Sequence, residues 1–191
     1  DEEASAADRN AIAFSDITEH WAVESIKQAV LDGIITGYPD GTFRPDKPIS
    51  RAEFTVMLAH ALDLDGSGAS LPFTDRAEIG AWAEEAIARA VRVGIVNGYG
   101  DGRFQPNAPI TRSEMAIMIA RALQLPAVAI AQTGFTDNDR IPGWAKSAVE
   151  SLRKLDIVNG RGDGKYVPDD NVTRAESVVA LLRMLGSKGQ D

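Results

Sequence analysis

The chain of 191 residues contains no cysteine and only two histidines, His20 and His60. Disulfide bonds and thiolate metal sites are therefore excluded, and so is a repeated catalytic site built on histidine. No stretch approaches the roughly 18 consecutive apolar residues that a membrane-spanning helix requires. The acidic first ten residues do not resemble a signal peptide. We therefore expect no membrane insertion, no metal and no cofactor.

Positive charge is also scarce. Lysine and arginine number 20 against 28 aspartate and glutamate residues, which gives a formal net charge of −8 at pH 7. Nucleic acid is therefore not expected as a partner, because phosphate binding requires a basic face. An anionic ligand would have to be held by a local cationic pocket.

The sequence contains one unit that is repeated three times. Each copy begins with Phe-Ser-Asp or Phe-Thr-Asp, continues with Trp-Ala and a glycine-rich segment, and ends with (Ser/Thr)-Arg-X-Glu. Equivalent residues are about 61 positions apart, and a repeat of this kind determines the fold. We predict an acidic N-terminal linker followed by three modules, with bounds 1–13, 14–66, 73–126 and 135–186.

Each copy is predicted to form a helix, a loop and a second helix. Apolar residues recur at helical spacing after the tryptophan. Gly33 and Gly94 then stand where a left-handed residue ends a helix, and Asp156 takes that place in the third copy. Ser50 and Glu53 form the capping box that opens the second helix of the first copy. A two-helix unit cannot bury its apolar faces alone, so we predict an all-α body in which the copies pack around a pseudo-threefold axis.

Three sets of repeated side chains are candidates either for the core of the fold or for a ligand-binding site. The phenylalanines that open the copies are expected in the core. A tryptophan at this position is by default half-buried in the core, but its indole could also stack on a sugar ring. The aspartate of each copy could cap the first helix or accept hydrogen bonds from hydroxyl groups. These sets are Phe14, Phe73 and Phe135; Trp21, Trp82 and Trp144; and Asp16, Asp75 and Asp137.

An arginine follows the helix cap in all three copies, as Arg51, Arg112 and Arg174. The partial positive charge of a helix N-terminus disfavours a cation at this position. Arginine binds carboxylate or phosphate through two hydrogen bonds, and the amides of the first helical turn would add donors beside it. We therefore favour an anionic ligand at these arginines, and expect Arg112→Ala to weaken binding without lowering stability. The alternative is an ion pair with an acidic residue of the neighbouring copy.

The combined motifs resemble the S-layer homology (SLH) domain, from about Phe14 to Leu185. The resemblance implies three tandem modules in a three-pronged spindle, with a central three-helix bundle and binding grooves between adjacent prongs. It also implies an extracellular protein of the bacterial cell wall or S-layer. Such proteins are held non-covalently by secondary cell wall polysaccharide, often through pyruvylated N-acetylmannosamine.

The same resemblance assigns roles to individual residues. The three arginines would grip the ketal carboxylate, and the repeated aspartates and tryptophans would line the sugar side of the grooves. Tyr38 and Tyr99 would stack or form hydrogen bonds, whereas the third copy has Arg161 at this position and its groove is expected to differ most. Glycines would let the polymer approach the backbone; they are Gly37, Gly98 and Gly160.

Two other classes of function compete with carbohydrate binding. The grooves could take acidic peptide segments or mediate self-assembly of a surface array. An enzyme is disfavoured, because no repeated pair of carboxylates stands out as the acid and base that a glycosidase needs. We expect no catalytic residue, and a monomer in which the three copies form a pseudo-trimer.

Overall fold

The computed structural model describes residues 11–66 and 70–188, so most of the predicted linker over residues 1–13 lies outside the described residues. The described part of the chain contains six α-helices, two 3-10 helices and no strand. The α-helices are α2 (Val23–Leu31), α3 (Arg51–Ala61), α4 (Ala81–Arg92), α5 (Arg112–Ala122), α6 (Gly143–Lys154) and α7 (Arg174–Lys188). The 3-10 helices are η1 (Arg76–Glu78) and η2 (Asn138–Arg140). The prediction of an all-α fold is confirmed.

Local sequence signals set both ends of these helices. Gly33 and Gly94 have φ angles of 70° and 75°, and Asp156 adopts 55° at the same position in the third copy. The predicted helix stops are thus confirmed, and Asp156 holds a left-handed conformation that costs more for a residue with a Cβ atom.

Both hydrogen bonds of the capping box form at the start of each second helix. The cap hydroxyl accepts from the backbone of the glutamate three residues later, and that glutamate accepts from the cap amide. The pairs are Ser50 with Glu53, Thr111 with Glu114, and Thr173 with Glu176.

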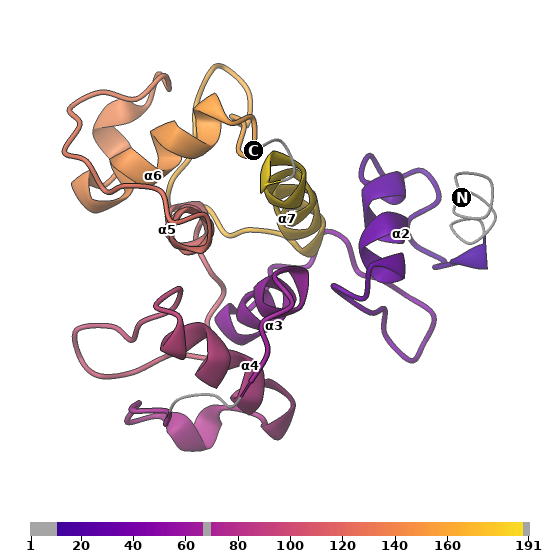
Figure 1. Ribbon diagram of the computed structural model, residues 1–191. Helices are drawn as coiled ribbons and strands as arrows, with labels where there is room; N and C mark the ends of the chain where they lie inside the picture. The colour runs from indigo at the N-terminus through magenta and orange to yellow at the C-terminus, as the bar shows by residue number, and fades with distance from the viewer. Residues whose placement is uncertain (1–10, 67–69, 189–191) are drawn as a thin grey trace.

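The three copies are arranged as a three-pronged body (Figure 1). Helices α3, α5 and α7 lie at the centre, and α2, α4 and α6 project outward. Helix α4 packs on α3, α6 packs on α5, and α2 packs on α7. Each outer helix therefore rests on the central helix of the preceding copy, and the last copy closes on the first. The predicted spindle with a central three-helix bundle is confirmed.

A closed ring of backbone hydrogen bonds ties the copies together at the axis. The amide of Ile49 donates to Val172 at 2.9 Å, Val172 donates to Ile110 at 3.0 Å, and Ile110 donates back to Ile49 at 3.1 Å. All three side chains are fully buried. Each copy thus donates one bond of the ring and accepts another.

Aromatic pairs fill the core of each prong. The opening phenylalanine packs against a fully buried aromatic residue of the glycine-rich loop, with ring centroids 5.1–5.6 Å apart. Phe73 and Phe135 are buried and Phe14 is partly buried, so the core prediction for these residues is confirmed. The loop partners are Phe43, Phe104 and Tyr166.

Candidate functional site

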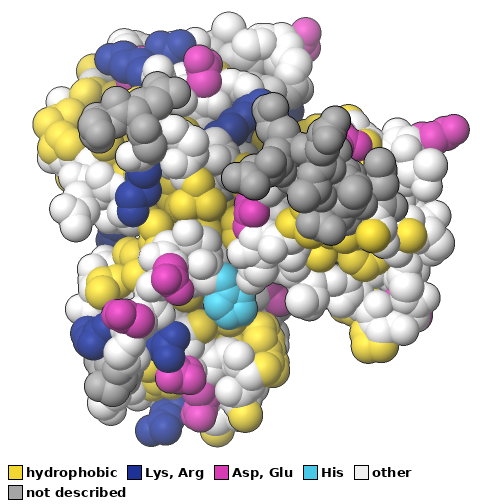
Figure 2. Space-filling view, turned by 45° about the vertical axis from the view of Figure 1, so that its right-hand side comes forward, with side chains coloured by type: hydrophobic (Ala, Val, Ile, Leu, Met, Phe, Trp, Pro, Cys, Tyr) yellow, Lys and Arg dark blue, Asp and Glu magenta, His cyan; other side chains and the backbone are white. Residues whose placement is uncertain are grey.

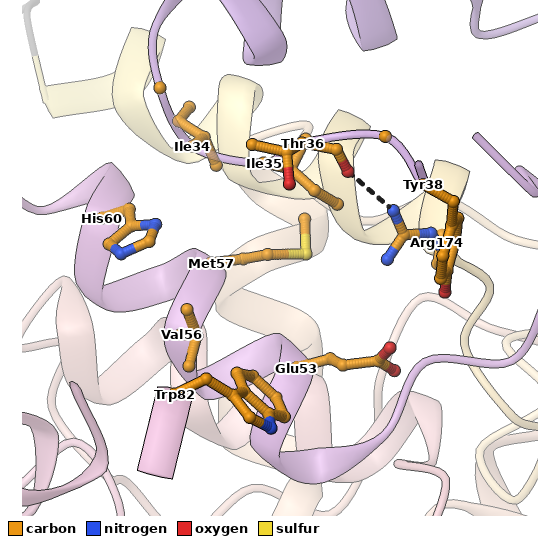
Figure 3. Close-up of a pocket in the computed structure, with 12 residues that line it drawn as sticks. Ile34, Ile35, Thr36, Tyr38, Glu53, Val56, Met57, His60, Trp82 and Arg174 are labelled. Carbon is orange, nitrogen blue, oxygen red and sulfur yellow. Dashed lines mark hydrogen bonds between the residues drawn. The ribbon is translucent and has the colours of Figure 1, made fainter. Parts of the chain in front are cut away.

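Hollows lie between the protruding parts of the molecule, with hydrophobic side chains at their floor (Figure 2). The first, which we call groove 1, has a volume of about 320 Å³ and is lined by the loop 33–38 of the first copy and by α3. Arg174 of the third copy and Trp82 of the second copy complete its walls. Figure 3 shows Glu53 reaching from α3 toward Arg174 and Tyr38. One groove therefore draws residues from all three copies.

A second cavity of about 220 Å³, groove 3, repeats this plan in the third copy. Its walls are the loop 157–161, α7, Arg112 of the second copy and Trp21 of the first. The pseudo-threefold arrangement defines the remaining position, groove 2, by the loop 95–99, α5 and Arg51. Trp144 lies on α6, which packs against α5 as α4 packs against α3, so it takes the place of Trp82 there.

The three arginines are buried and clamp the loop of the next copy. Arg174 donates from Nε to the carbonyl of Phe43 at 3.0 Å. Its Nη2 atom donates to the carbonyl of Thr36 at 3.1 Å (Figure 3). Arg112 donates in the same way to Tyr166 at 2.7 Å and to Asn159 at 2.6 Å. Their guanidinium groups lie over aromatic rings of the same loop. Arg174 and Arg112 thus hold adjacent copies together chiefly through backbone carbonyls, whereas Arg51 makes one such bond, to Asn97 at 2.8 Å.

The first-turn amides next to these arginines are already engaged. The amides of Arg51 and Ala52 donate to the carbonyls of Ala108 and Pro106 in the second copy. The same pair of bonds links the second copy to the third and the third to the first. The prediction that these amides are free to bind an anion is therefore wrong, because the neighbouring copy supplies their acceptors. The helix termini serve contact between the copies, so a ligand would have to be held by other groups that line the grooves.

The tryptophans lie on the surface. Trp21, Trp82 and Trp144 are 61–66% exposed, so the default expectation of a half-buried core residue is wrong. Trp82 and Trp21 instead form walls of grooves 1 and 3. An indole held open to solvent at the edge of a groove offers an apolar face to a sugar ring.

The repeated aspartates differ from their expected position at the sugar side of the grooves. Asp75 is buried and accepts from the amides of Phe104 and Gln105, both at 2.8 Å. Asp16 and Asp137 bind the equivalent amides of their own copies. No aspartate is among the residues that line groove 1 or groove 3. Each carboxylate accepts a hydrogen bond from the amide of a loop residue with a positive φ angle and so stabilises the loop. These loop residues are Arg44, Gln105 and Val167.

The repeated glycines are required by packing within the protein. A Cβ atom on Gly37 would lie 2.0 Å from the Phe14 ring, and one on Gly98 would lie 2.9 Å from Phe73. A Cβ atom on Gly160 would lie 2.8 Å from the backbone carbonyl oxygen of Lys165. These contacts explain the glycines without a ligand, although Gly37 and Gly160 also line their grooves.

Replacing Gly160 with alanine is expected to destabilise the fold, because the backbone of Lys165 cannot move aside as a flexible side chain would. Overpacking of this kind costs about 1–3 kcal/mol, and thermal unfolding followed by circular dichroism should show the loss. Gly100 is the matched control, since a Cβ atom there meets no atom within 4 Å. Equal melting temperatures for G160A and G100A would contradict the packing explanation.

The capping-box glutamate lines the groove in the first and third copies, a feature that the sequence reasoning missed. Glu53 lines groove 1 and Glu176 lines groove 3. Tyr38 lines groove 1 and accepts a hydrogen bond from Lys47 at 3.0 Å. Tyr99 donates to Glu114, and burial together with this hydrogen bond raises the pKa of Tyr99 to about 12.

Arg161 in the third copy occupies the tyrosine position and grips Glu176 from Nε at 2.8 Å and from Nη2. Burial alone would raise the pKa of Glu176, but the hydrogen bonds from Arg161 and from the Thr173 amide lower it overall. The same guanidinium binds Asp170 at 2.9 Å. Groove 3 therefore differs from groove 1 in the residue used, whereas both place a cation on the capping-box glutamate.

The described ranges bear on two further features, metal-ligand clusters and helices able to cross a membrane. Residues 11–66 and 70–188 contain no cluster of three or more histidine, aspartate or glutamate side chains that could hold a metal ion. Among the helices of these ranges, none combines the length and apolar character of a membrane span.

Comparison with known sequences identifies the family. The profile of the S-layer homology domain matches residues 13–55, 72–116 and 134–176. The chain belongs to the S-layer homology domain family, of which it carries three tandem copies. The resemblance inferred from the repeated motifs is thus confirmed.

Curated relatives include both enzymes and surface-layer proteins. The chain is 36% identical over 184 residues to an endoglucanase of Bacillus sp. (strain KSM-635), covering 92% of this chain and 19% of the relative. It is 34% identical over 180 residues to an amylopullulanase of Thermoanaerobacterium thermosulfurigenes, covering 92% of this chain and 10% of the relative. It is 34% identical over 167 residues to S-layer protein EA1 of Bacillus anthracis, covering 86% of this chain and 19% of the relative.

The chain spans about a fifth or less of the length of these relatives. The relatives named as enzymes match it only over this small share of their length. The family and its S-layer members indicate a location at the bacterial cell wall or S-layer and support a role in anchoring at the cell surface.

Proposed function

We propose that the chain anchors a larger surface protein to the bacterial cell wall by binding an acidic secondary cell wall polysaccharide in the grooves between its copies. The bound group is a pyruvylated N-acetylmannosamine terminus, whose ketal carboxylate contacts the groove arginine. The observation that carries this proposal is the position of Arg174 in groove 1. Its Nε and Nη2 atoms donate to loop carbonyls, and Nη1 has no hydrogen-bond or ion-pair partner within the described residues.

The rest of groove 1 suits a sugar. The exposed indole of Trp82 stands at its wall, and Val56, Met57 and Ile34 supply an apolar floor. A neighbouring hollow of about 470 Å³ shares Glu53 and Trp82 with groove 1 and extends toward Asn107. This continuation supports a polymer as the ligand, because further sugar units have a surface to follow.

A purely anchoring role also fits the chemistry of the groove carboxylates. Glu53 accepts from the Ser50 amide and from Lys47, so both of its oxygens are engaged. A glycosidase needs two carboxyl groups about 5–10 Å apart that are free to act as acid and as base or nucleophile. We therefore propose a non-catalytic module, which acts as a monomer because its three copies close the ring within one chain.

Titration calorimetry with purified wall polysaccharide tests the proposal. We expect the intact polymer to bind, and mild-acid removal of its pyruvate groups to weaken binding strongly, since the guanidinium then loses its charged partner. A polymer treated with the same acid and then repyruvylated is the control for chain damage. Binding that survives depyruvylation unchanged would reject the carboxylate contact, and a lack of binding to any wall polymer would reject the anchoring mechanism.

A further inference from the structure

The capping box places the negative charge of a glutamate at each groove, where it would repel an anionic ligand. Its glutamate is fixed at the first turn of a central helix, with one carboxylate oxygen bound to the cap amide. The other oxygen, Oε1, is bound by side chains and not by the helix backbone, and the glutamate side chains remain 19–23% exposed. An anionic ligand that enters beside this carboxylate is repelled unless a cation neutralises it. The side chain that binds Oε1 differs between the three copies.

In groove 1 the cation is Lys47. Its Nζ atom lies 3.3 Å from Oε1 of Glu53 and 3.0 Å from Oη of Tyr38. The hydrogen bond to Tyr38 and the charge of Glu53 raise the pKa of Lys47, so the ammonium stays charged. Arg174 makes no ion pair with Glu53 or any other carboxylate among the described residues. The glutamate is thus neutralised without the arginine.

In groove 3 the cation comes from another position. The residue equivalent to Lys47 is Asp170, and the residue equivalent to Tyr38 is Arg161. Arg161 binds Oε1 of Glu176 at 2.8 Å and is itself oriented by Asp170 at 2.9 Å. Arg112 lies 3.6 Å from the same oxygen. The exchange of lysine and tyrosine for aspartate and arginine keeps a cation on the carboxylate, and Arg161 shares its charge between Glu176 and Asp170.

Within the described residues, groove 2 has no cation equivalent to Lys47 or Arg161 at its capping-box glutamate. The residue equivalent to Lys47 is Ala108, and the tyrosine is retained as Tyr99. Oε1 of Glu114 accepts from the neutral Tyr99 hydroxyl, and the nearest cation in the described structure is Arg51 at 4.0 Å. The Nε atom of Arg51 is buried without a hydrogen-bond partner, whereas the equivalent atoms of Arg112 and Arg174 bind loop carbonyls.

These observations separate the arginine of groove 2 from its two counterparts. Arg51 turns Nη1 toward Tyr99 at 3.4 Å and keeps only one bond to a loop carbonyl, that of Asn97 at 2.8 Å. It is the only cation within ion-pair distance of Glu114 among the described residues, so this carboxylate competes with an external anion for the same guanidinium.

We propose that Lys47 and Arg161 are positioning residues that neutralise the capping-box glutamate, so that grooves 1 and 3 accept an anionic sugar while groove 2, which has alanine at position 108, binds it at least about tenfold more weakly. This inference rests on the proposed function and adds which grooves are occupied. It reverses the expectation that the groove of Arg161 departs most from the others.

Another cation of groove 2 bears on this proposal. Arg121 lies two helical turns beyond Glu114 on α5, at the position of His60 in groove 1 and Arg183 in groove 3. It makes no ion pair with Glu114 within the described structure, and burial together with the charge of Arg51 lowers the pKa of Arg121. Arg121 therefore leaves the glutamate without its own countercharge.

The three tryptophans allow each groove to be observed separately. The chain has one tryptophan per groove, so a ¹⁵N-labelled sample gives three indole N–H signals in an NMR spectrum, each assigned by replacing that tryptophan with phenylalanine. The probe is the methyl glycoside of 4,6-O-pyruvylated N-acetylmannosamine. We expect the signals of Trp82 and Trp21 to shift at low probe concentration, and that of Trp144 only at concentrations at least about tenfold higher.

Ala108→Lys should bring the Trp144 signal into the low concentration range, with Ala108→Met as the matched uncharged control. Position 108 is partly exposed and its backbone bonds do not involve the side chain, so both variants should fold. Lys47→Met should weaken the response of Trp82 alone, and Lys47→Arg should restore it. Equal affinity of all three grooves, or equal effects of A108K and A108M, would overturn the proposal. A probe that shifts no signal in any groove would instead reject the proposed function.

Discussion

Replacing Arg112 with alanine is expected to lower the free energy of unfolding by about 2–5 kcal/mol, because two backbone carbonyls at a buried interface lose their charged donor. The guanidinium bonds to Tyr166 and Asn159 are both shorter than 2.8 Å, and the side chain is only 6% exposed. For a chain of this length the loss corresponds to roughly 4–20 °C in melting temperature. This expectation replaces the one drawn from the sequence, that only binding would suffer.

Arg183 provides the control for charge. It lines the same groove but is exposed, so Arg183→Ala removes one positive charge without opening the interface between copies. Arg112→Lys should recover part of the stability, since an ammonium can reach one carbonyl but lacks the planar fork and the stacking on Tyr166. Calorimetric melting temperatures that fall equally for R112A and R183A would contradict the role of Arg112 as a clamp between copies.

Asp75→Asn is the second substitution for which we expect a large effect. The carboxylate is buried and receives the amides of Phe104 and Gln105, and the second of these residues has a φ angle of 58°. An asparagine keeps one acceptor oxygen for one of these backbone amides. Its side-chain NH2 group faces the other backbone N–H, so two donors meet and that N–H has no acceptor. We expect a loss of about 2–4 kcal/mol, from the unmet buried donor and the loss of hydrogen bonds to a charged group. Urea unfolding at pH 7 measures this loss.

The effect should depend on pH with a defined sign. Burial raises the pKa of Asp75, but the hydrogen bonds from the Phe104 and Gln105 amides lower it overall. A lowered pKa means that the carboxylate stabilises the fold above its unfolded pKa of about 3.9 and loses that contribution as the pH falls toward the folded value. The difference between wild type and D75N should therefore shrink between pH 5 and pH 2. Asp101→Asn on the exposed turn is the matched control, and a difference independent of pH would contradict this account.

The repeat allowed most of the fold to be predicted from the sequence. Helix stops at Gly33 and Gly94 and the capping box at Ser50 depend on neighbouring residues, so their signals are local. The need of each copy to bury an apolar face then requires contact between copies. The family resemblance supplied the spindle and its central bundle, which these local signals do not determine.

The partners of the arginines could not be predicted in this way. Arg174 binds the carbonyl of Phe43, 131 positions earlier in the chain, and a backbone carbonyl leaves no mark in a sequence. The side chains of the sequence indicate only carboxylates and external anions as partners for an arginine. The exposed tryptophans were misjudged for a related reason, since their position depends on how an outer helix sits on the preceding copy.

The countercharges were present in the sequence but were not recognised. Comparing Lys47, Ala108 and Asp170 with Tyr38, Tyr99 and Arg161 shows that the third copy exchanges both positions together and the second copy changes only one. Such a paired exchange indicates contact between the two positions. The structure supplies what the comparison lacks, namely the glutamate that both positions approach.

The ring formed by Ile49, Ile110 and Val172 also determines how such a chain can grow or shrink. In an open solenoid a repeat can be added or lost at either end, because the stack has terminal members. Here every copy contacts a neighbour on both sides. A fourth copy would therefore find no unoccupied contact surface, and the loss of one copy would expose the contact surfaces of the two that remain. A longer chain of this kind would have to add copies in complete sets of three.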